Sequence, residues 1–253
     1  MKLSFASPLA LVLVSVLAPR SLCSQSDVNP AQIAQTLVRA HIGWRTRLPS
    51  PNTSLQAKEV EREGSVVRYN LYVSGLPTDK LYSVLSWPVG QAKPSTVFQG
   101  LSIGKGGLVI CAGRTPGQCV DASEKDGPVD FTFNPAKGEP YRLALYSGDY
   151  RAAIVIVPDP IIGEDKGCII SVERLLPHFE LAYLSGTGFS PNGDVKFDGE
   201  SYGEKHAISA KADSQGNFSA ALLPAVAGHQ KGTTTLKGVG MSCSPSLKFD
   251  WGQ

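Results

Sequence analysis

The sequence has no excess of charge of either sign. Its 24 lysine and arginine residues stand against 22 aspartate and glutamate residues, which gives a formal net charge of +2 over 253 residues. Two of the basic residues, Lys2 and Arg20, lie in a leader that we expect to be removed, and the balance is then 22 against 22. A neutral surface gives no long-range attraction to phosphate. The composition therefore argues against a nucleic-acid partner.

Long apolar runs are also scarce. The longest, PLALVLVSVLA at residues 8–18, follows the positive Lys2 and is short for a membrane span. This pattern predicts a signal peptide over residues 1–23, with cleavage near Cys23 or Ser24. A retained anchor and a lipidated Cys23 are the alternatives, although Arg20 and Leu22 depart from the lipidation motif. We expect a secreted, periplasmic or cell-envelope protein that meets a membrane only through its signal peptide.

Patterns typical of metal and cofactor sites are lacking. The sequence contains no CxxC pair and no two histidines at the spacing of a zinc site. GLSIGKGG, residues 100–107, does not have the spacing of a phosphate-binding loop. Two groups of acidic residues could suit calcium but match no twelve-residue calcium loop, and we interpret them as solvated. They are Asp159, Glu164 and Asp165, and Asp194, Asp198, Glu200 and Glu204. No metal and no cofactor is predicted.

The sequence offers few candidates for acid–base catalysis. A catalytic triad needs a nucleophile, a histidine and an acid in mutual reach. The chain has four histidines, which are His41, His178, His206 and His229. We place His206 on the polar side of its strand and His229 in the glycine-rich loop VAGHQKG, and interpret both as solvated. No catalytic residue is predicted.

Cysteine occurs five times. Apart from Cys23, the cysteines are an even number in a chain that we expect to be exported, which favours disulfides. Four cysteines allow three pairings. We favour Cys111 with Cys119, which closes the short loop CAGRTPGQC, and Cys168 with Cys243, which would join the first and last strands of the second β-region. The connectivity is open at this stage.

One helix is predicted near the N-terminus. Asn29 suits an N-cap and Pro30 the first helical position. Four residues follow at the spacing of one helical face, namely Ile33, Leu37, His41 and Trp44. The helix could be an arm that docks a partner, or it could cover an open end or edge of the next domain. We favour the second interpretation because an apolar helix face is normally buried within its own protein.

The remainder of the chain alternates between apolar and polar residues. Val67, Tyr69 and Leu71 show this pattern early, and YRLALYSGDYRAAIVIVP is the clearest hairpin. Residues 159–167 are predicted to connect two β-regions. In the second region we predict strands at 168–174, 178–185, 194–198, 204–212, 217–223, 233–239 and 246–251. Many short strands separated by turn residues favour β-sandwiches.

These patterns predict an all-β protein with two β-sandwich domains preceded by a signal peptide and a short helix. The expected boundaries are 1–23 for the signal peptide, 24–54 for the helix and linker, 55–165 for the first sandwich and 166–253 for the second. In SGTGFSPNGDVKFDG, which begins at Ser185, we interpret the glycines and the proline as corners of the sheet rather than a ligand loop.

The same stretch carries a family resemblance. SGTGFSPNGDVKFDG resembles the G-x-GF-x-P…V-x-F-x-G signature of IPT/TIG-type immunoglobulin-like domains, and the similarity covers roughly residues 185–218. The chain is similar to secreted bacterial proteins with tandem domains of this type. The resemblance implies immunoglobulin-like sandwiches that serve as spacers, adhesive modules or parts of larger surface proteins. It implies no particular functional residue.

Aromatic residues supply the only candidate ligand surface. Sugars stack on exposed aromatic rings, and the candidates in the first β-region are Trp87, Tyr82, Tyr146 and Tyr150. The competing interpretation places Trp87 in a core. We therefore expect a non-catalytic binding or structural module, adhesive or glycan-binding, with a protein or glycan partner. The alternative is a secreted hydrolase, or an inhibitor of one, whose site is assembled from distant loops.

Overall fold

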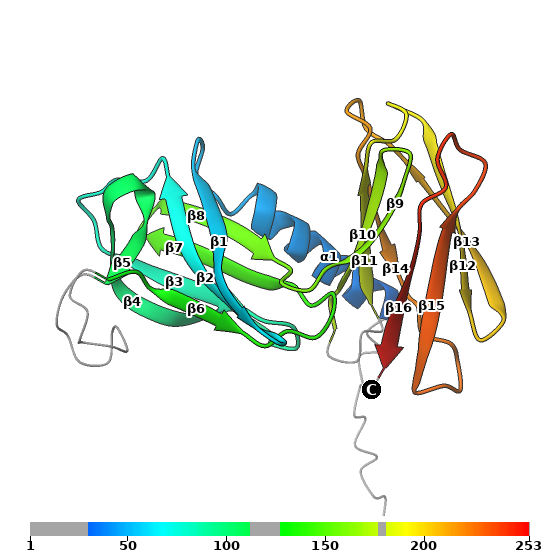
Figure 1. Ribbon diagram of the computed structural model, residues 1–253, viewed down its shortest axis with the longest axis horizontal. Helices are drawn as coiled ribbons and strands as arrows, with labels where there is room; N and C mark the ends of the chain where they lie inside the picture. Colours follow the sequence, from blue (N-terminus) through cyan, green and yellow to red (C-terminus); the bar gives the residue numbers. More distant parts are fainter. Residues whose placement is uncertain (1–29, 112–126, 177–180, 253) are drawn as a thin grey trace, which may run out of the picture.

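The computed structural model describes residues 30–111, 127–176 and 181–252, and it is mostly β (Figure 1). Its strands are antiparallel and form four sheets. One α-helix, α1 (Pro30–Thr46), precedes them. The expected fold class is thus confirmed at the level of an all-β protein with a short N-terminal helix. No helix in the described ranges is both long and apolar enough to cross a membrane.

The first two sheets enclose one hydrophobic core. The three-stranded sheet contains β1 (Ser54–Glu63), β2 (Val66–Ser74) and β6 (Asp130–Phe133). The five-stranded sheet runs in the order β5 (Val109–Cys111), β4 (Ser95–Ile103), β3 (Tyr82–Trp87), β7 (Tyr141–Ser147) and β8 (Tyr150–Ile156). A short 3-10 helix, η1 (Lys105–Gly107), precedes β5. We call this half, β1–β8, the first sandwich.

Alternation along β7 produces two different faces. Leu143 and Leu145 enter the core between the sheets, whereas Arg142 and Ala144 point to the outer face of the five-stranded sheet. All four residues are buried, so the outer face of this sheet is also covered. A strand that is buried on both faces reads as a nearly continuous apolar run, and a charge within such a run needs a partner.

The second sandwich consists of two four-stranded sheets. One has the order β14 (Phe218–Leu222), β11 (Ala182–Thr187), β10 (Cys168–Arg174) and β9 (Ile161–Asp165). The other has the order β13 (Glu204–Lys211), β12 (Asp194–Ser201), β15 (Lys231–Gly238) and β16 (Ser246–Gly252). The alternation predicted for β12 and β16 is confirmed, since the apolar residues Val195, Phe197, Leu247, Phe249 and Trp251 are buried and the residues between them in each strand are exposed. In β12 the small residues Gly199 and Ser201 continue the buried set.

Strand β9 corrects the prediction that residues 159–167 only connect two regions. Ile161 and Gly163 are buried, and Ile161 belongs to the core of the second sandwich. Lys166 and Gly167 both have positive φ and form the tight turn from β9 to β10, where Asp165 pairs with Cys168. The change from the first sandwich to the second therefore comes before Ile161, and not at residue 166.

The glycines of SGTGFSPNG have structural roles. Gly188 has φ +81°, and a Cβ added there would lie 2.2 Å from the carbonyl oxygen of Gly167. At Gly186 an added Cβ would meet the ring of Phe218 at 2.3 Å. Phe189 packs edge-on against Phe218 with ring centroids 5.0 Å apart. The absence of side chains at both glycines thus allows the backbone and the aromatic core to approach closely.

One predicted disulfide is confirmed. Cys168 and Cys243 are bonded, with their Cα atoms 6.2 Å apart, and both are buried. The bond links the first residue of β10 in one sheet to the segment that precedes β16 in the other. Cys111 also takes part in a disulfide, but its predicted partner, Cys119, lies outside the described residues. A disulfide is consistent with an oxidising, exported environment.

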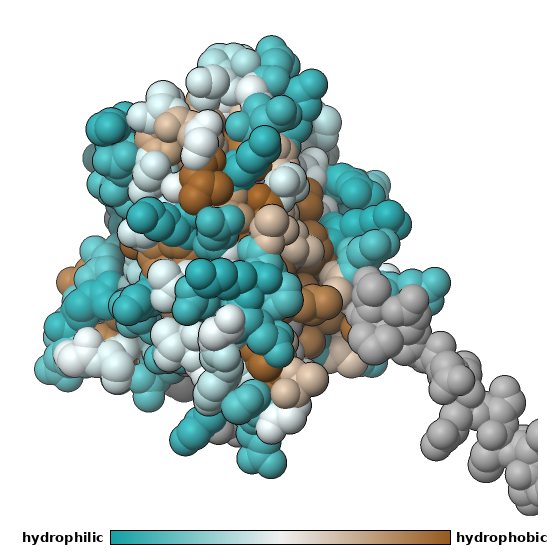
Figure 2. Space-filling view, turned by 90° about the vertical axis from the view of Figure 1, so that its right-hand side faces the viewer, coloured by the Kyte–Doolittle hydropathy of each residue, from teal (hydrophilic) through white to brown (hydrophobic). Residues whose placement is uncertain are grey.

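Figure 2 looks onto the end of the molecule formed by the second sandwich. Hydrophilic residues cover most of this face, while hydrophobic residues show mainly in a band near its middle. This agrees with the alternation of β12 and β16, which places large apolar side chains between the sheets and charged side chains outside.

Candidate functional site

Helix α1 lies between the two sandwiches and contacts both (Figure 1). Its first turns pack on the second sandwich, where Ala34 joins a buried cluster with Leu181 and Tyr183. Its last turns pack on the outer face of the five-stranded sheet, where Trp44 joins Trp87 and Ala144. The interpretation of α1 as a cover within its own protein is therefore correct for the described residues, but the helix covers two bodies rather than one.

Trp44 anchors the end of the helix to the first sandwich. Its Nε1 donates to the carbonyl oxygen of Leu143 at 3.1 Å. Its ring centroid is 5.8 Å from that of Trp87, and the guanidinium of Arg142 lies 4.6 Å from the Trp87 ring centroid. An indole that is buried with its N–H satisfied combines a large apolar contact with a directional bond, so this contact fixes both the position and the rotation of α1.

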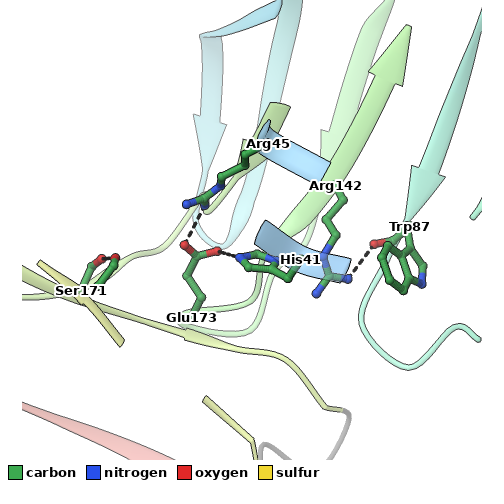
Figure 3. Close-up of polar contacts among 7 residues, drawn as sticks. His41, Arg45, Trp87, Arg142, Ser171 and Glu173 are labelled. Atoms are coloured by element: carbon green, nitrogen blue, oxygen red, sulfur yellow. Dashed lines mark hydrogen bonds and ion pairs between the residues drawn. The ribbon is translucent and has the colours of Figure 1, made fainter. Parts of the chain in front are cut away.

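Four charged or polar side chains meet where the helix and the two sandwiches come together (Figure 3). We call His41, Arg45, Arg142 and Glu173 the junction cluster. Arg142 of β7 donates from Nε to Nδ1 of His41 at 2.9 Å. Nε2 of His41 lies 3.1 Å from Oε2 of Glu173 in β10, and Arg45 donates from Nη2 to Oε1 of Glu173 at 2.7 Å. His41 thus stands between an arginine of the first sandwich and a carboxylate of the second.

Burial makes these contacts significant. His41 is 0% exposed, and Arg142 and Glu173 are also buried, whereas the side chain of Arg45 is 38% exposed. The approach of His41 Nε2 to Glu173 is poorly aligned for a hydrogen bond, and neither atom has another partner in the described part of the chain. Charges out of water are costly unless they are paired, so the helix must keep its position for the junction cluster to stay compensated.

The hydrogen bond from Arg142 assigns the tautomer of His41. Because Nδ1 accepts a hydrogen bond from Arg142, a neutral ring carries its hydrogen on Nε2, which faces the carboxylate. A second proton on Nδ1 would point at a guanidinium. Burial lowers the pKa of His41 below its ordinary value of 6.5, and the neighbouring Arg142 and Arg45 act in the same direction against the raising effect of Glu173.

Burial and neighbouring charges also determine the pKa values of Arg142 and Glu173. Burial lowers the pKa of Arg142 to about 10, although Glu173 opposes this shift. For Glu173, burial disfavours the charged form, but the contacts with His41 and the charge of Arg45 outweigh it and lower the pKa below its ordinary value of 4.5. At neutral pH the cluster therefore holds a neutral imidazole between a cationic guanidinium and a carboxylate.

We expect the stability of the protein to fall as the pH drops below 6.5, the ordinary pKa of histidine. In the window between 6.5 and the lower folded pKa of His41, the unfolded chain takes up a proton that the folded chain does not, so acid favours unfolding. Below 4.5 the lowered pKa of Glu173 adds a second loss. The groups that face His41 are Arg142, Glu173, Arg45 and the ring of Tyr183, whose centroid is 5.2 Å away. Urea unfolding of the wild type and of His41→Gln at several pH values measures the first effect.

Glutamine at position 41 can accept from Arg142 but does not titrate. The His41→Gln variant should therefore lose the decline in stability in the window just below pH 6.5. It should show a weaker decline below 4.5, because the contact with His41 that lowers the pKa of Glu173 is removed while the charge of Arg45 remains. His206→Gln is the matched control because the His206 side chain is 65% exposed and should leave the profile unchanged. An unaltered profile in His41→Gln would show that His41 does not cause the acid sensitivity.

The sequence analysed alone did not single out Arg45, Arg142 or Glu173. A signal was present, because Arg142 interrupts the apolar run YRLALYS and Glu173 interrupts CIISVER. A charged residue inside such an apolar run either lies at the edge of its sheet or pairs with a residue that is distant in the sequence. Nothing local says which residue is the partner, since Arg142 and His41 are 101 positions apart.

The junction cluster does not have the geometry of a serine hydrolase. Ser171 lies two residues before Glu173 in the same strand, but its Oγ is 2.9 Å from Oγ of Ser185 (Figure 3). Both nitrogens of His41 are engaged, one by Arg142 and the other facing Glu173. A general base needs a nitrogen free to receive the proton of the nucleophile. What this arrangement can do is hold three elements together.

A second feature is a pocket of about 140 Å³ between the sheets of the second sandwich. Strands β12, β13, β15 and β16 line it from one sheet and β14 from the other. Most of the lining is apolar, with Ile208, Leu222, Leu223, Leu236 and Phe249. We call this space the inter-sheet pocket. Its polar side chains include Ser201, Thr234 and His206.

The prediction that no catalytic residue is present overlooked one pentapeptide at the inter-sheet pocket. GESYG, residues 199–203, has the G-x-S-x-G spacing that surrounds the nucleophilic serine of many hydrolases. In the structure the pentapeptide covers the end of β12 and the two-residue turn of a β-hairpin, with Tyr202 and Gly203 at positive φ and Ser201 opposite Glu204. It is thus not the strand-to-helix elbow that this motif requires for an exposed nucleophile.

The position predicted for His206 is corrected in part. Its side chain is exposed, as expected, and lies 3.6 Å from the carboxylate of Glu204. However, His206 pairs with Gly199 and shares the inward face of its sheet with Ile208, so it lines the inter-sheet pocket. His229 stacks on the ring of Tyr202 with centroids 3.7 Å apart. His178 lies outside the described residues.

The four aromatic residues of the predicted platform do not form one exposed row. Tyr82 is buried, and its hydroxyl donates to the carbonyl oxygen of Pro77 at 2.6 Å. Trp87 is buried under α1, and its Nε1 donates to Gln91 at 2.7 Å. Tyr146 is half-buried and Tyr150 is exposed. A platform made of all four is excluded because their strands direct two of the rings into the two faces of a sheet that is covered on both sides.

The acidic residues that were considered for calcium remain separate from one another. Within the described ranges, no three histidine, cysteine or acidic side chains gather closely enough to hold a metal ion. Asp165 instead accepts a hydrogen bond from the amide of Ser244 at 2.6 Å, beside the disulfide at Cys243. This carboxylate supports the loop that carries the cysteine.

Comparison with known proteins adds no family. No protein-family model matches the chain, and no curated protein matches it at a significant level. The resemblance carried by SGTGFSPNGDVKFDG thus stays a prediction, and the function has to be argued from the geometry.

Proposed function

We propose that the protein is a non-catalytic structural or binding module of the cell envelope or extracellular space, in which helix α1 holds two immunoglobulin-like sandwiches in a fixed relative position. One observation carries the proposal. The buried His41 contacts Arg142 of the first sandwich on one side and Glu173 of the second on the other. A connection made only by a flexible linker would leave these charges in water.

The energetics favour a rigid arrangement. Separating the sandwiches would detach α1 from one of them, and this would expose the apolar surface either of Ala34, Leu181 and Tyr183 or of Trp44 and Trp87. It would also leave Arg142 and Glu173 without the imidazole between them. Interfaces between domains that move freely are small and polar, whereas this one combines two apolar clusters with a buried polar cluster.

A fixed angle between two sandwiches suits a spacer or an adhesive module, which must present a binding surface in a defined direction. The family resemblance implies the same roles for immunoglobulin-like domains of the IPT/TIG type. Export through the signal peptide fits the disulfide between Cys168 and Cys243. The partner is a protein or a glycan. Of the four aromatic residues predicted to bind a sugar, Tyr150 is the one whose ring is exposed.

Residual dipolar couplings of the exported chain test the rigidity. One alignment tensor should fit the amides of both sandwiches in the wild type. In Trp44→Ala, which removes the anchor on Leu143 and Trp87, the two sandwiches should require separate tensors. Ile33→Ala, on the exposed side of the same helix, is the matched control and should behave as the wild type. A wild type that needs two tensors, or a Trp44→Ala variant that needs only one, would contradict the role of α1.

A second candidate function is favoured by one specific observation. Ser201 and His206 line the same pocket, and Glu204 lies 3.6 Å from His206, which are the residue types of a hydrolase site. A hydrolase of this kind would be labelled at Ser201 by a fluorophosphonate and would turn over a p-nitrophenyl ester, and Ser201→Ala would abolish both. Neither labelling nor turnover is expected if the module is non-catalytic.

A further inference from the structure

We propose that the inter-sheet pocket of the second sandwich binds a small neutral molecule with an apolar body about the size of one aromatic ring and a single hydroxyl group. This goes beyond the proposed function and does not depend on helix α1, because no residue of the helix or of the first sandwich lines the pocket. The argument rests on the size of the pocket, its lining and an unpaired buried hydroxyl.

The volume sets the size of the ligand. The pocket measures about 140 Å³, and a cavity of roughly 150 Å³ lined by aliphatic and aromatic side chains holds one benzene molecule. Ile208, Leu236 and Phe249 from one sheet and Leu222 from the other supply that kind of lining. Its entrance is open to solvent, since Leu223 is exposed and His206 beside it is exposed as well.

A buried hydroxyl sets the chemistry of the ligand. Thr234 lines the pocket and is only 6% exposed, yet its Oγ1 has no hydrogen-bond partner in the part of the chain that the structure describes. A buried polar group without a partner costs on the order of 1–3 kcal/mol. That oxygen is itself enclosed by protein atoms, so the Thr234 side chain has to turn about χ1 to present it to the pocket, and a ligand hydroxyl bound there would recover that cost.

A second hydroxyl lies on the neighbouring strand. Glu200 of β12 pairs with Thr235 of β15, and Ser201 and Thr234 each lie one position further along. Ser201 accepts a hydrogen bond from Nε1 of Trp251 at 3.1 Å, which leaves its own hydrogen available. Together the two side chains offer a donor and an acceptor to one ligand hydroxyl. An anionic ligand is disfavoured because no lysine or arginine lines the pocket among the described residues. A cationic ligand is disfavoured because Glu200, the carboxylate in the described lining, is at an exposed, outward position of β12.

Toluene and p-cresol are suitable probes, because they share one apolar body and differ by one hydroxyl. Each is titrated into the full exported chain while the methyl resonances of Ile208, Leu222 and Leu236 are followed. We expect both probes to shift these methyls and p-cresol to bind about five-fold more tightly, which is the effect of one net hydrogen bond. Absence of methyl shifts with either probe would overturn the proposal.

Thr234→Val keeps the shape of the side chain and removes the hydroxyl. We expect it to reduce the preference for p-cresol to near one while leaving toluene binding unchanged. Thr235→Val makes the same change on the adjacent, outward-facing position and should keep the preference, as should Thr234→Ser, which retains a hydroxyl. A preference that survives in Thr234→Val would overturn the role of this hydroxyl. None of these outcomes depends on the relative position of the sandwiches, so failure here is distinguishable from failure of the proposed function.

Discussion

Replacing Cys168 and Cys243 together by alanine is expected to lower the free energy of unfolding of the second sandwich by about 4 kcal/mol. The two cysteines are 75 positions apart, and a cross-link that closes a loop of this length removes much conformational freedom from the unfolded chain. The bond also ties the two sheets together at one end of the sandwich. For a sandwich of ordinary stability this is a large fraction of the total.

Urea unfolding followed by circular dichroism, together with hydrogen exchange of β10 and β16, measures this loss. Reduced wild-type protein should resemble the reduced double variant, because reductant also opens the disulfide that contains Cys111. A loss below about 1 kcal/mol would mean that the native packing of the sheets, and not the cross-link, limits unfolding.

The second large effect is expected for Glu173→Ala, which should destabilise the protein by about 3 kcal/mol. The substitution removes the carboxylate that accepts from Arg45 and that faces His41 Nε2. It also removes the carboxylate whose charge, among the described residues, raises the pKa of the buried guanidinium of Arg142. A buried charge that has lost its partner is far more costly than the original pair is stabilising.

Two comparison variants identify the cause of this loss. Arg45→Ala should cost less than about 1 kcal/mol, because an ion pair with a partly exposed partner is screened by solvent, and the Arg45 side chain is 38% exposed. A combined change of Arg142→Met and Glu173→Leu should be less destabilising than Glu173→Ala alone, since it removes both charges. If the combined variant is instead worse than Glu173→Ala, shape rather than charge determines the stability of the junction.

The strands of the second sandwich were predicted well because their signal is local. In DVKFDGES and SLKFDWG every second residue is apolar or small, and this alternation alone assigns a face to each side chain. Strand β9 was missed for a related reason. It is only five residues long, contains Gly163 and ends in a turn, so it reads as a loop until β10 pairs with it.

The helix shows where local patterns stop being informative. One face was predicted to contain Ile33, Leu37, His41 and Trp44, but Ile33 is exposed while Ala34 is buried. Leu37, Val38 and Ile42 contact the second sandwich, and Ala40 and Trp44 contact the first. A helix between two bodies buries two sides, so its sequence does not show the single apolar stripe of a helix that lies on one surface.

The sequence by itself determined most of the strands and the tight turns, because alternation and turn chemistry act between neighbours in the chain. It favoured the pairing of Cys168 with Cys243 but left the connectivity open, and the structure decided it. Only the tertiary structure decided that Arg142, His41 and Glu173 meet, that Tyr82 and Trp87 are buried, and that Ser201, Thr234 and His206 share a pocket. These residues come from strands and a helix far apart in the sequence. Which of them face one another depends on how the sheets stack and on where the helix docks. Both arrangements are determined by the burial of whole apolar surfaces and not by any local stretch of sequence.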